Sequence, residues 1–270
     1  MRIALLAGLA LCLAGPALAQ PTRPEAAPQD ALALVQQVNA RDVGTWSTRR
    51  VVMELSGRRG GKRTREAMLF HRFFGKEKRI ALFYLSPVPI RGTAFLTWDQ
   101  HEGRDLQWLY LPALRKTRRI TTRDRGKSFM GTDLSYEDLK RELKISEADY
   151  TFERVGHKAC DEAQCAGVEG TPVSPEIARE LGYGRVRWWI DPSNWMVRLA
   201  EYWDPGGRAL KTTHVEDIHK VDGIWSAGRI EVSNLQTGHR SVFRVEDLDL
   251  ATEVPADLFE KNSLSRGWRR

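Results

Sequence analysis

The chain has 270 residues, and its 42 lysines and arginines against 35 aspartates and glutamates give a formal net charge of +7. This length suits one β-rich domain that can bury a sizeable core. The mildly basic balance favours anionic partners over cationic ones, so lipid headgroups, nucleic acid and acidic protein surfaces are the candidate partner classes.

The N-terminal residues predict export. Arg2 supplies a short positive region, and residues 3–14 form an apolar run that is too short to span a bilayer. Ala17 and Ala19 place small residues at the positions of a cleavage site. We therefore expect residues 1–19 to be a signal peptide cleaved after Ala19, and the mature protein to be periplasmic. An uncleaved anchoring helix is the alternative.

The next stretch changes from a tether to a helix. Residues 20–29 are rich in proline and alanine, which predicts a flexible lead. A helix is predicted over residues 30–39, because Asp30 can cap it and Leu34 and Val38 contribute to an apolar stripe.

Beyond this helix the apolar residues alternate with a period of two, which predicts strands. Short turns rich in glycine, proline and aspartate separate successive strands, so we expect an antiparallel sheet. The predicted strands cover residues 46–56, 63–74, 79–85, 93–98, 106–111, 150–157, 164–171, 185–191, 195–203, 209–220, 224–235 and 239–250.

Few other helices are expected. Residues 175–182 carry proline early and glycine late, an asymmetry typical of a short helix. Residues 255–264 predict a short closing helix, and the basic tail at 266–270 is expected to be disordered. The sequence thus predicts a single, mainly β domain over residues 30–265.

Residues 103–139 concentrate aromatic, basic and apolar side chains. The strand within this stretch ends at Pro112, because proline cannot donate to a strand ladder. A basic block follows, and after it come Phe129 and Met130. This combination suits a site that meets an amphiphile or a partner protein. The alternatives are a solvated loop or strand face for the basic block, and core packing for Phe129 and Met130.

Two cysteines remain in the mature chain. Cys160 and Cys165 are five residues apart and lie between strand-like segments, so we expect a disulfide that closes a hairpin in an oxidising compartment. A metal site is disfavoured, because no second pair of ligands has suitable spacing. A redox motif would need a C-x-x-C spacing.

The chain shows no convincing catalytic grouping. It contains no G-x-S-x-G, no phosphate-binding glycine loop and no H-E-x-x-H. His214 and His219 fall on opposite faces of one predicted strand and cannot easily share a metal. We expect neither an enzyme, nor a cofactor, nor a metal site. Nucleic acid is disfavoured as a partner, because the protein is exported and Asp124 and Asp133 dilute the basic block.

The tryptophans suggest an apolar concavity. A strongly curved sheet can pack many aromatic side chains on its concave face, and whatever helices leave unfilled becomes a cavity for acyl chains. Burying one methylene group contributes about 0.8 kcal/mol, so a long chain can bind without covalent chemistry. A closed aromatic core is the alternative. Eight of the nine tryptophans fall within or beside predicted strands: Trp46, Trp98, Trp108, Trp188, Trp189, Trp195, Trp203 and Trp225.

The central segment resembles a known family. The run WLYLPALRKTRRI at 108–120, KSFMGTDLSYEDL at 127–139 and RGTAFLTWD at 91–99 are similar to the signature of LolA-like outer-membrane lipoprotein-sorting proteins. More narrowly, they resemble the branch associated with RND-type lipid exporters. The later segments VDGIWSAGRIEVSN and PADLFEKNSL fit the same pattern, so the resemblance covers residues 31–264.

The resemblance implies an unclosed β-barrel like those of LolA and LolB. In it, a strongly curved antiparallel sheet would wrap over a few short helices that cover its concave side. It also implies a non-catalytic carrier of lipids or lipid-modified proteins between the inner and outer membranes. We expect the protein to be a monomer. A ligand-free adaptor module of an envelope transport complex, such as one built on an RND-type exporter, is the alternative.

The strand pattern and the basic block, rather than the resemblance, suggest three groups of candidate residues. Their faces depend on strand register, because a shift by one residue exchanges the two faces of a strand. Arg115, Lys116, Arg118 and Arg119 would attract an anionic headgroup or an acidic transporter surface. Phe129 and Met130 would form a mobile apolar lip. The acyl chains would lie along Phe73, Leu82, Phe95, Trp98, Trp108 and Tyr110.

Overall fold

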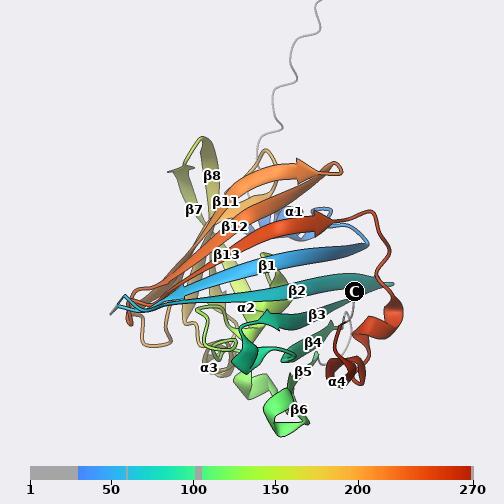
Figure 1. Cartoon of the computed structure of the whole chain (residues 1–270). Helices are drawn as coiled ribbons and strands as arrows, with labels where there is room; N and C mark the ends of the chain where they lie inside the picture. The colour runs from blue at the N-terminus through green and yellow to red at the C-terminus, as the bar shows by residue number, and fades with distance from the viewer. Residues whose placement is uncertain (1–29, 59, 101–104, 269–270) are drawn as a thin grey trace, which may run out of the picture.

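A computed structural model describes residues 30–58, 60–100 and 105–268 of the chain (Figure 1). The expected signal peptide and the flexible lead lie outside these residues. Within them, thirteen strands form one antiparallel sheet in the order β6-β5-β4-β3-β2-β1-β13-β12-β11-β10-β9-β8-β7. The sheet curves strongly but does not close, because its edge strands β6 and β7 do not pair. The predicted unclosed barrel is therefore confirmed.

The strand boundaries agree closely with the alternation in the sequence. The strands are β1 (Trp46–Ser56), β2 (Lys62–Phe74), β3 (Glu77–Ser86), β4 (Ala94–Asp99), β5 (Leu106–Leu111), β6 (Lys116–Ile120), β7 (Tyr150–Cys160), β8 (Ala163–Pro172), β9 (Arg185–Asp191), β10 (Met196–Trp203), β11 (Ala209–Val221), β12 (Ile224–Asn234) and β13 (Arg240–Asp249). The basic strand β6 is the one that the alternation did not predict. Its side chains are nearly all polar, so no apolar face marks it.

The helices are short. They are α1 (Ala31–Ala40), α2 (Tyr136–Arg141), α3 (Pro175–Leu181) and α4 (Ser263–Arg266), with 3-10 turns η1 (Val88–Ile90), η2 (Pro112–Leu114), η3 (Thr122–Asp124) and η4 (Ala256–Phe259). The predicted cap of α1 is confirmed, because the Asp30 carboxylate accepts a hydrogen bond from the Leu32 amide at 3.2 Å. Its buried residues Leu34, Val35 and Val38 pack against the sheet near β7 to β10.

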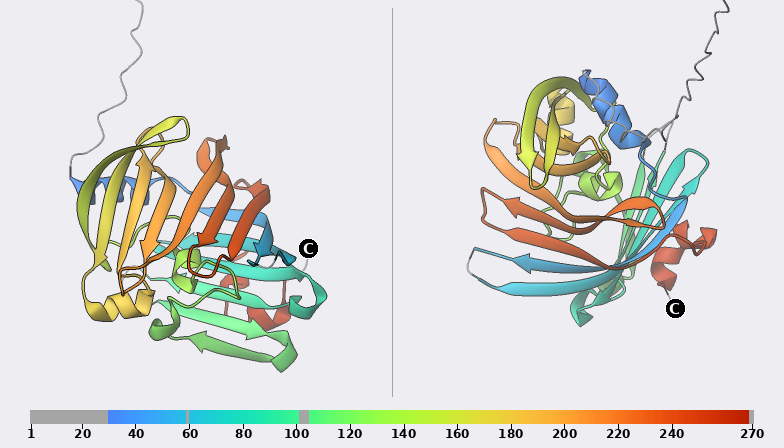
Figure 2. Two further views of the ribbon diagram at one scale, coloured as in Figure 1. Left: turned by 90° about the vertical axis from the view of Figure 1, so that its left-hand side faces the viewer. Right: turned by 90° about the horizontal axis from the view of Figure 1, so that it is seen from above.

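The two halves of the sheet are linked across its concave side. β1 and β13 pair in the middle, with an irregular register between Arg50 and Val51. The edge strands are joined by residues 121–149, here called the crossover segment, which carries α2 into the concavity (Figure 2). The curved sheet and the crossover segment therefore enclose the interior between them.

The convex face of β2 to β5 is covered by the C-terminal residues. Phe259 and Leu264 are fully buried against this face, and the Trp268 ring lies 5.8 Å from that of Phe70. The predicted closing helix is thus split into η4 and α4 (Figure 1). Within the expected disordered tail, Arg266 is helical and Trp268 is packed, which corrects that expectation for the part of the tail that the structure describes.

Candidate functional site

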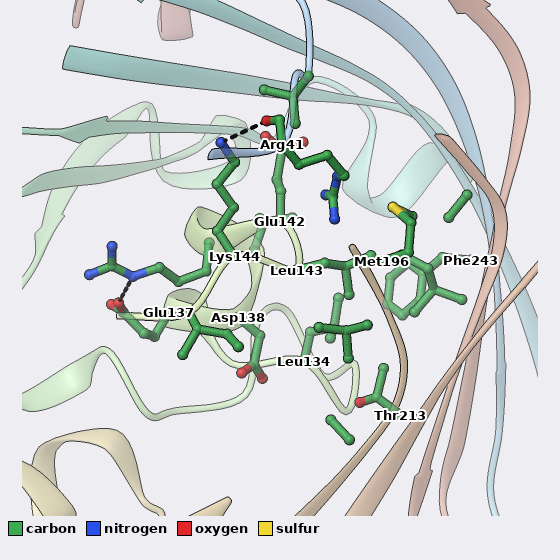
Figure 3. Close-up of a pocket in the computed structure, with 18 of the residues that line it drawn as sticks. Arg41, Leu134, Glu137, Asp138, Glu142, Leu143, Lys144, Met196, Thr213 and Phe243 are labelled. Atoms are coloured by element: carbon green, nitrogen blue, oxygen red, sulfur yellow. Dashed lines mark hydrogen bonds and ion pairs between the residues drawn. The ribbon is translucent and has the colours of Figure 1, made fainter. Parts of the chain in front are cut away.

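A pocket lies between the concave face and the crossover segment (Figure 3). It has a cavity volume of about 200 Å³ and is reached by side chains from both halves of the chain. Its apolar wall comes mainly from β1, β10, β12 and β13. The wall includes Val51, Leu69, Met196, Val197, Ala200, Ile230, Phe243 and Val245.

The crossover segment presents Leu143 to this wall. Leu143 follows α2 and lines the pocket, with Met196 and Phe243 opposite it in Figure 3. Glu142 and Leu143 have φ values of 49° and 68°, a left-handed conformation that is unfavourable for side chains of this size. The chain therefore turns sharply at the tip of α2 and places an apolar side chain inside the pocket.

Helix α2 is anchored by a capping box and a buried ion pair. The Ser135 hydroxyl accepts from the Asp138 amide at 3.0 Å, while the Asp138 carboxylate accepts from the Ser135 amide at 2.7 Å. The same carboxylate binds Lys211 Nζ on β11 at 2.6 Å and the Tyr183 hydroxyl at 2.8 Å. Removal of this carboxylate would leave Lys211 buried without its partner.

A second ionic cluster holds the far end of α2. One Glu142 oxygen lies 2.6 Å from Arg49 Nη1, and the other lies 3.3 Å from Lys78 Nζ and 3.9 Å from His71 Nδ1. Burial opposes the charge of Glu142, but Arg49 and Lys78 hold its pKa at about 2. The tip of α2 is thus tied to β1 and β3 by charge.

A polar cleft adjoins the apolar pocket and is also lined by the crossover segment. It has a cavity volume of about 440 Å³ and contains side chains of both charges. Lys78, Arg141, Lys144 and Asp149 line both the cleft and the pocket. An amphiphile could therefore place its chain in the pocket and its polar group towards the cleft.

This architecture is similar to that of known proteins. A family model described as an uncharacterized protein matches residues 76–266. A domain from Vibrio parahaemolyticus, described as an outer membrane lipoprotein-sorting protein domain, has 29% identity and a TM-score of 0.79, covering 87% of this chain and 98% of that one. The chain belongs to the LolA-like family.

Two further structures share the LolA-like fold. A DUF1329 family protein from Desulfovibrio piger has 26% identity and a TM-score of 0.79, covering 86% of this chain and 96% of that one. A LolA superfamily protein from Nitrosomonas europaea has 20% identity and a TM-score of 0.66, covering 86% and 98%. No curated protein matches the chain significantly.

The expected acyl-chain residues divide between the two faces of this LolA-like sheet. Leu82 and Phe95 are on the concave face but are completely buried in the same cluster as Phe129 and do not line the pocket. Phe73 lines the polar cleft. None of these three side chains is among those that line the apolar pocket.

Trp98, Trp108 and Tyr110 lie on the convex face, which corrects their expected position in the cavity. They pack in the cluster that the C-terminal residues cover, and Trp98 Nε1 donates to the Phe259 carbonyl at 2.9 Å. Both faces of these strands are apolar, so the alternation showed which residues share a face but not which face is concave.

Phe129 is a core residue rather than an exposed lip. Only 1% of it is accessible, and its ring lies 5.2 Å from that of Phe95 and 5.4 Å from that of Tyr136. Met130 packs partly buried against the same cluster, and its carbonyl accepts from Arg65 Nη1 at 2.6 Å. These contacts fix the loop before α2 and correct the expectation of a mobile lip.

The four basic candidates lie together at one edge of the sheet. Arg115, Lys116, Arg118 and Arg119 are exposed on β6 and the turn before it. Among the described residues, none of the four takes part in an ion pair. Their positive charge is therefore presented to solvent, outside the pocket.

Cys160 and Cys165 are buried free thiols in the structure, which differs from the expected disulfide. Lys158 lies opposite Cys165, and Ala163 lies opposite Cys160, so the two sulfurs share one face of the hairpin in diagonal positions. Burial raises the pKa of Cys165, so its thiol is disfavoured as a nucleophile. The disulfide stays a prediction for the exported protein.

The sequence pattern alone did not identify most of the residues that line the pocket. The wall formed by β10, β12 and β13 alternates clearly, but nothing local indicates that its apolar face meets the crossover segment. Across the described ranges, no group of three or more His, Cys, Asp or Glu side chains could hold a metal. No helix in the described part of the chain is long and apolar enough to cross a membrane.

Proposed function

We propose that this protein is a periplasmic carrier that binds the acyl chains of lipids or of lipid-modified proteins for transfer between the inner and outer membranes. The observation that carries this proposal is the apolar pocket enclosed by the concave face and the crossover segment. The LolA-like family supports it, since the Vibrio relative is described as a lipoprotein-sorting domain. Binding and release would be non-catalytic.

The pocket must enlarge to accept a long chain, and the tip of α2 is the element placed to allow it. Leu143 occupies space between Met196 and the helix, in a left-handed conformation that costs on the order of 1–3 kcal/mol. Movement of this tip would release that strain and open the wall. Each methylene that then enters would contribute about 0.8 kcal/mol. Leu143 thus occupies space that the cargo would fill.

The basic edge of the sheet would serve docking rather than chain binding. The exposed cations of β6 and its preceding turn suit an acidic surface of an inner-membrane transporter, such as an RND-type exporter. An edge strand also offers unpaired backbone groups to a partner. The second candidate function is a ligand-free adaptor. The basic edge would support this function if no ligand occupied the pocket.

Native mass spectrometry of protein isolated from the periplasm tests the carrier proposal. We expect a co-purified lipid whose mass is lost when the pocket is blocked, as by Val245→Trp on β13. The adaptor alternative instead predicts lipid-free protein that still captures its partner. Replacing Arg118 and Arg119 by glutamate should then abolish capture without changing lipid content. Protein that carries no lipid and takes up no fluorescent fatty acid would contradict the carrier proposal.

A further inference from the structure

Two partly buried cations lie where the apolar pocket meets more polar surroundings. Arg41 follows α1 and lines the pocket, while Lys144 follows α2 and lines both the pocket and the polar cleft. Figure 3 shows Lys144 reaching towards the backbone at Arg41, with the Arg41 guanidinium directed towards the pocket. Among the described residues, neither cation forms an ion pair.

The hydrogen bonds of Arg41 leave most of its guanidinium unused. Nη1 donates to the Trp195 carbonyl at 3.2 Å, and the buried Nε has no hydrogen-bond partner. A guanidinium offers five donors in a planar fork that fits a carboxylate or phosphate. Burial lowers the pKa of Arg41 to about 10, which leaves it charged at neutral pH.

Lys144 is bound by carbonyl groups alone. Its ammonium donates to the Asn39 carbonyl at 2.8 Å and to the Arg41 carbonyl at 3.4 Å. Burial lowers the pKa of Lys144 to about 8, and the nearby cations Lys78 and Arg41 act in the same direction. An anion at this position would stabilise its charged form.

Glu142 and Asp42 act on these cations without forming an ion pair with either. Glu142 acts on both, but its oxygens already bind Arg49 and Lys78 within 3.3 Å, and Asp42 acts on Lys144. Glu142 therefore interacts with four cations in this region. An uncompensated buried charge is costly, and a bound anion would offset that cost.

We propose that Arg41 and Lys144 form a binding site for the oxyanion headgroup, carboxylate or phosphate, of an amphiphile whose chain occupies the apolar pocket. This inference rests on the carrier function proposed above and specifies its cargo as anionic. The Arg41 fork would hold two oxygens, and Lys144 would exchange a carbonyl for a third contact. Neutral lipids of equal chain length would bind more weakly.

Titration calorimetry with a long-chain saturated fatty acid and the alcohol of the same chain tests this inference. The wild type should bind the acid about tenfold more tightly than the alcohol, the difference expected for charge-assisted hydrogen bonds. The Arg41→Gln/Lys144→Gln variant should bind the acid no better than the alcohol. Its unchanged affinity for the alcohol would show that the pocket is intact.

Two controls accompany the double variant. Arg179→Gln removes an exposed arginine of α3 that lies outside the pocket, and it should leave both affinities unchanged. Arg41→Lys keeps the charge but loses the fork, so it should retain part of the preference for the acid. Titration with inorganic phosphate alone shows whether the two cations bind a free oxyanion or only the headgroup of an amphiphile.

The outcomes separate this inference from the carrier proposal. Equal affinity of the wild type for acid and alcohol would overturn the headgroup site and leave the carrier function standing. The same conclusion would follow if the double variant still bound the acid more tightly than the alcohol. Tight binding of phosphate without either amphiphile would assign the cations to a free oxyanion and overturn the headgroup. If neither amphiphile nor phosphate binds, both proposals fail.

Discussion

His71 illustrates how the sheet tolerates a polar residue in its interior. The side chain on β2 is completely buried, with Nδ1 2.9 Å from the Ser47 hydroxyl and Nε2 3.2 Å from the Gly44 carbonyl. Burial lowers the pKa of His71 to about 4, although Glu142 acts in the opposite direction. The imidazole is therefore neutral in the folded protein near pH 7.

Acidification should destabilise the protein through His71. The folded-state pKa lies below the ordinary value of 6.5, so between pH 6.5 and 4 the unfolded chain binds a proton that the folded protein excludes. The free energy of unfolding should fall by about 2 kcal/mol between pH 7 and 5 from this residue alone. Urea unfolding at the two pH values measures it. An equal loss in a folded His71→Gln variant would show that another group is responsible.

At the scale of elements, the crossover segment is held by charges that the sequence did not reveal as partners. The structure caps α2 with Ser135. Asp138 meets Lys211 from a strand 73 residues further along the chain. Such a pair depends on the curvature of the whole sheet, so local spacing could not predict it.

Loss of the Asp138 carboxylate should loosen α2. Asp138→Asn leaves the Lys211 ammonium buried without its carboxylate, which costs about 3–5 kcal/mol. Ser135→Ala removes one cap bond and should cost about 1 kcal/mol. Urea unfolding compares both with Asp257→Asn, whose carboxylate is 72% exposed and should matter little. Similar stability of Asp138→Asn and this control would contradict the anchoring role.

The C-terminal elements support the sheet from outside. Phe259 is completely buried on the convex face, and its ring lies 5.8 Å from that of Phe74. Phe259→Ala should therefore lower the free energy of unfolding by about 3–5 kcal/mol. Fatty-acid affinity of the folded protein should stay unchanged, because this residue does not line the pocket. A variant that is equally stable, or that loses binding while folded, would contradict this division of faces.

For the whole molecule, alternation and turn residues predicted nearly every strand and the antiparallel sheet. They could not predict which face is concave, because strands such as β4 carry apolar residues on both faces. Trp98 is partly buried against the C-terminal residues, whereas Phe95 is completely buried against Phe129 on the other face. The choice between faces is made by the crossover segment and the C-terminal helices, through contacts between distant parts of the chain.

The central claim is that acyl chains bind between the concave face and the crossover segment. Fluorescent fatty-acid uptake by Val245→Trp and Val173→Trp tests it most directly, because the same substitution fills the pocket at one position and stays on the surface at the other. Val173 is 51% exposed, between β8 and α3. We expect uptake by the wild type and Val173→Trp, and at least about a tenfold loss of affinity in folded Val245→Trp. Equal uptake by all three proteins would contradict the account.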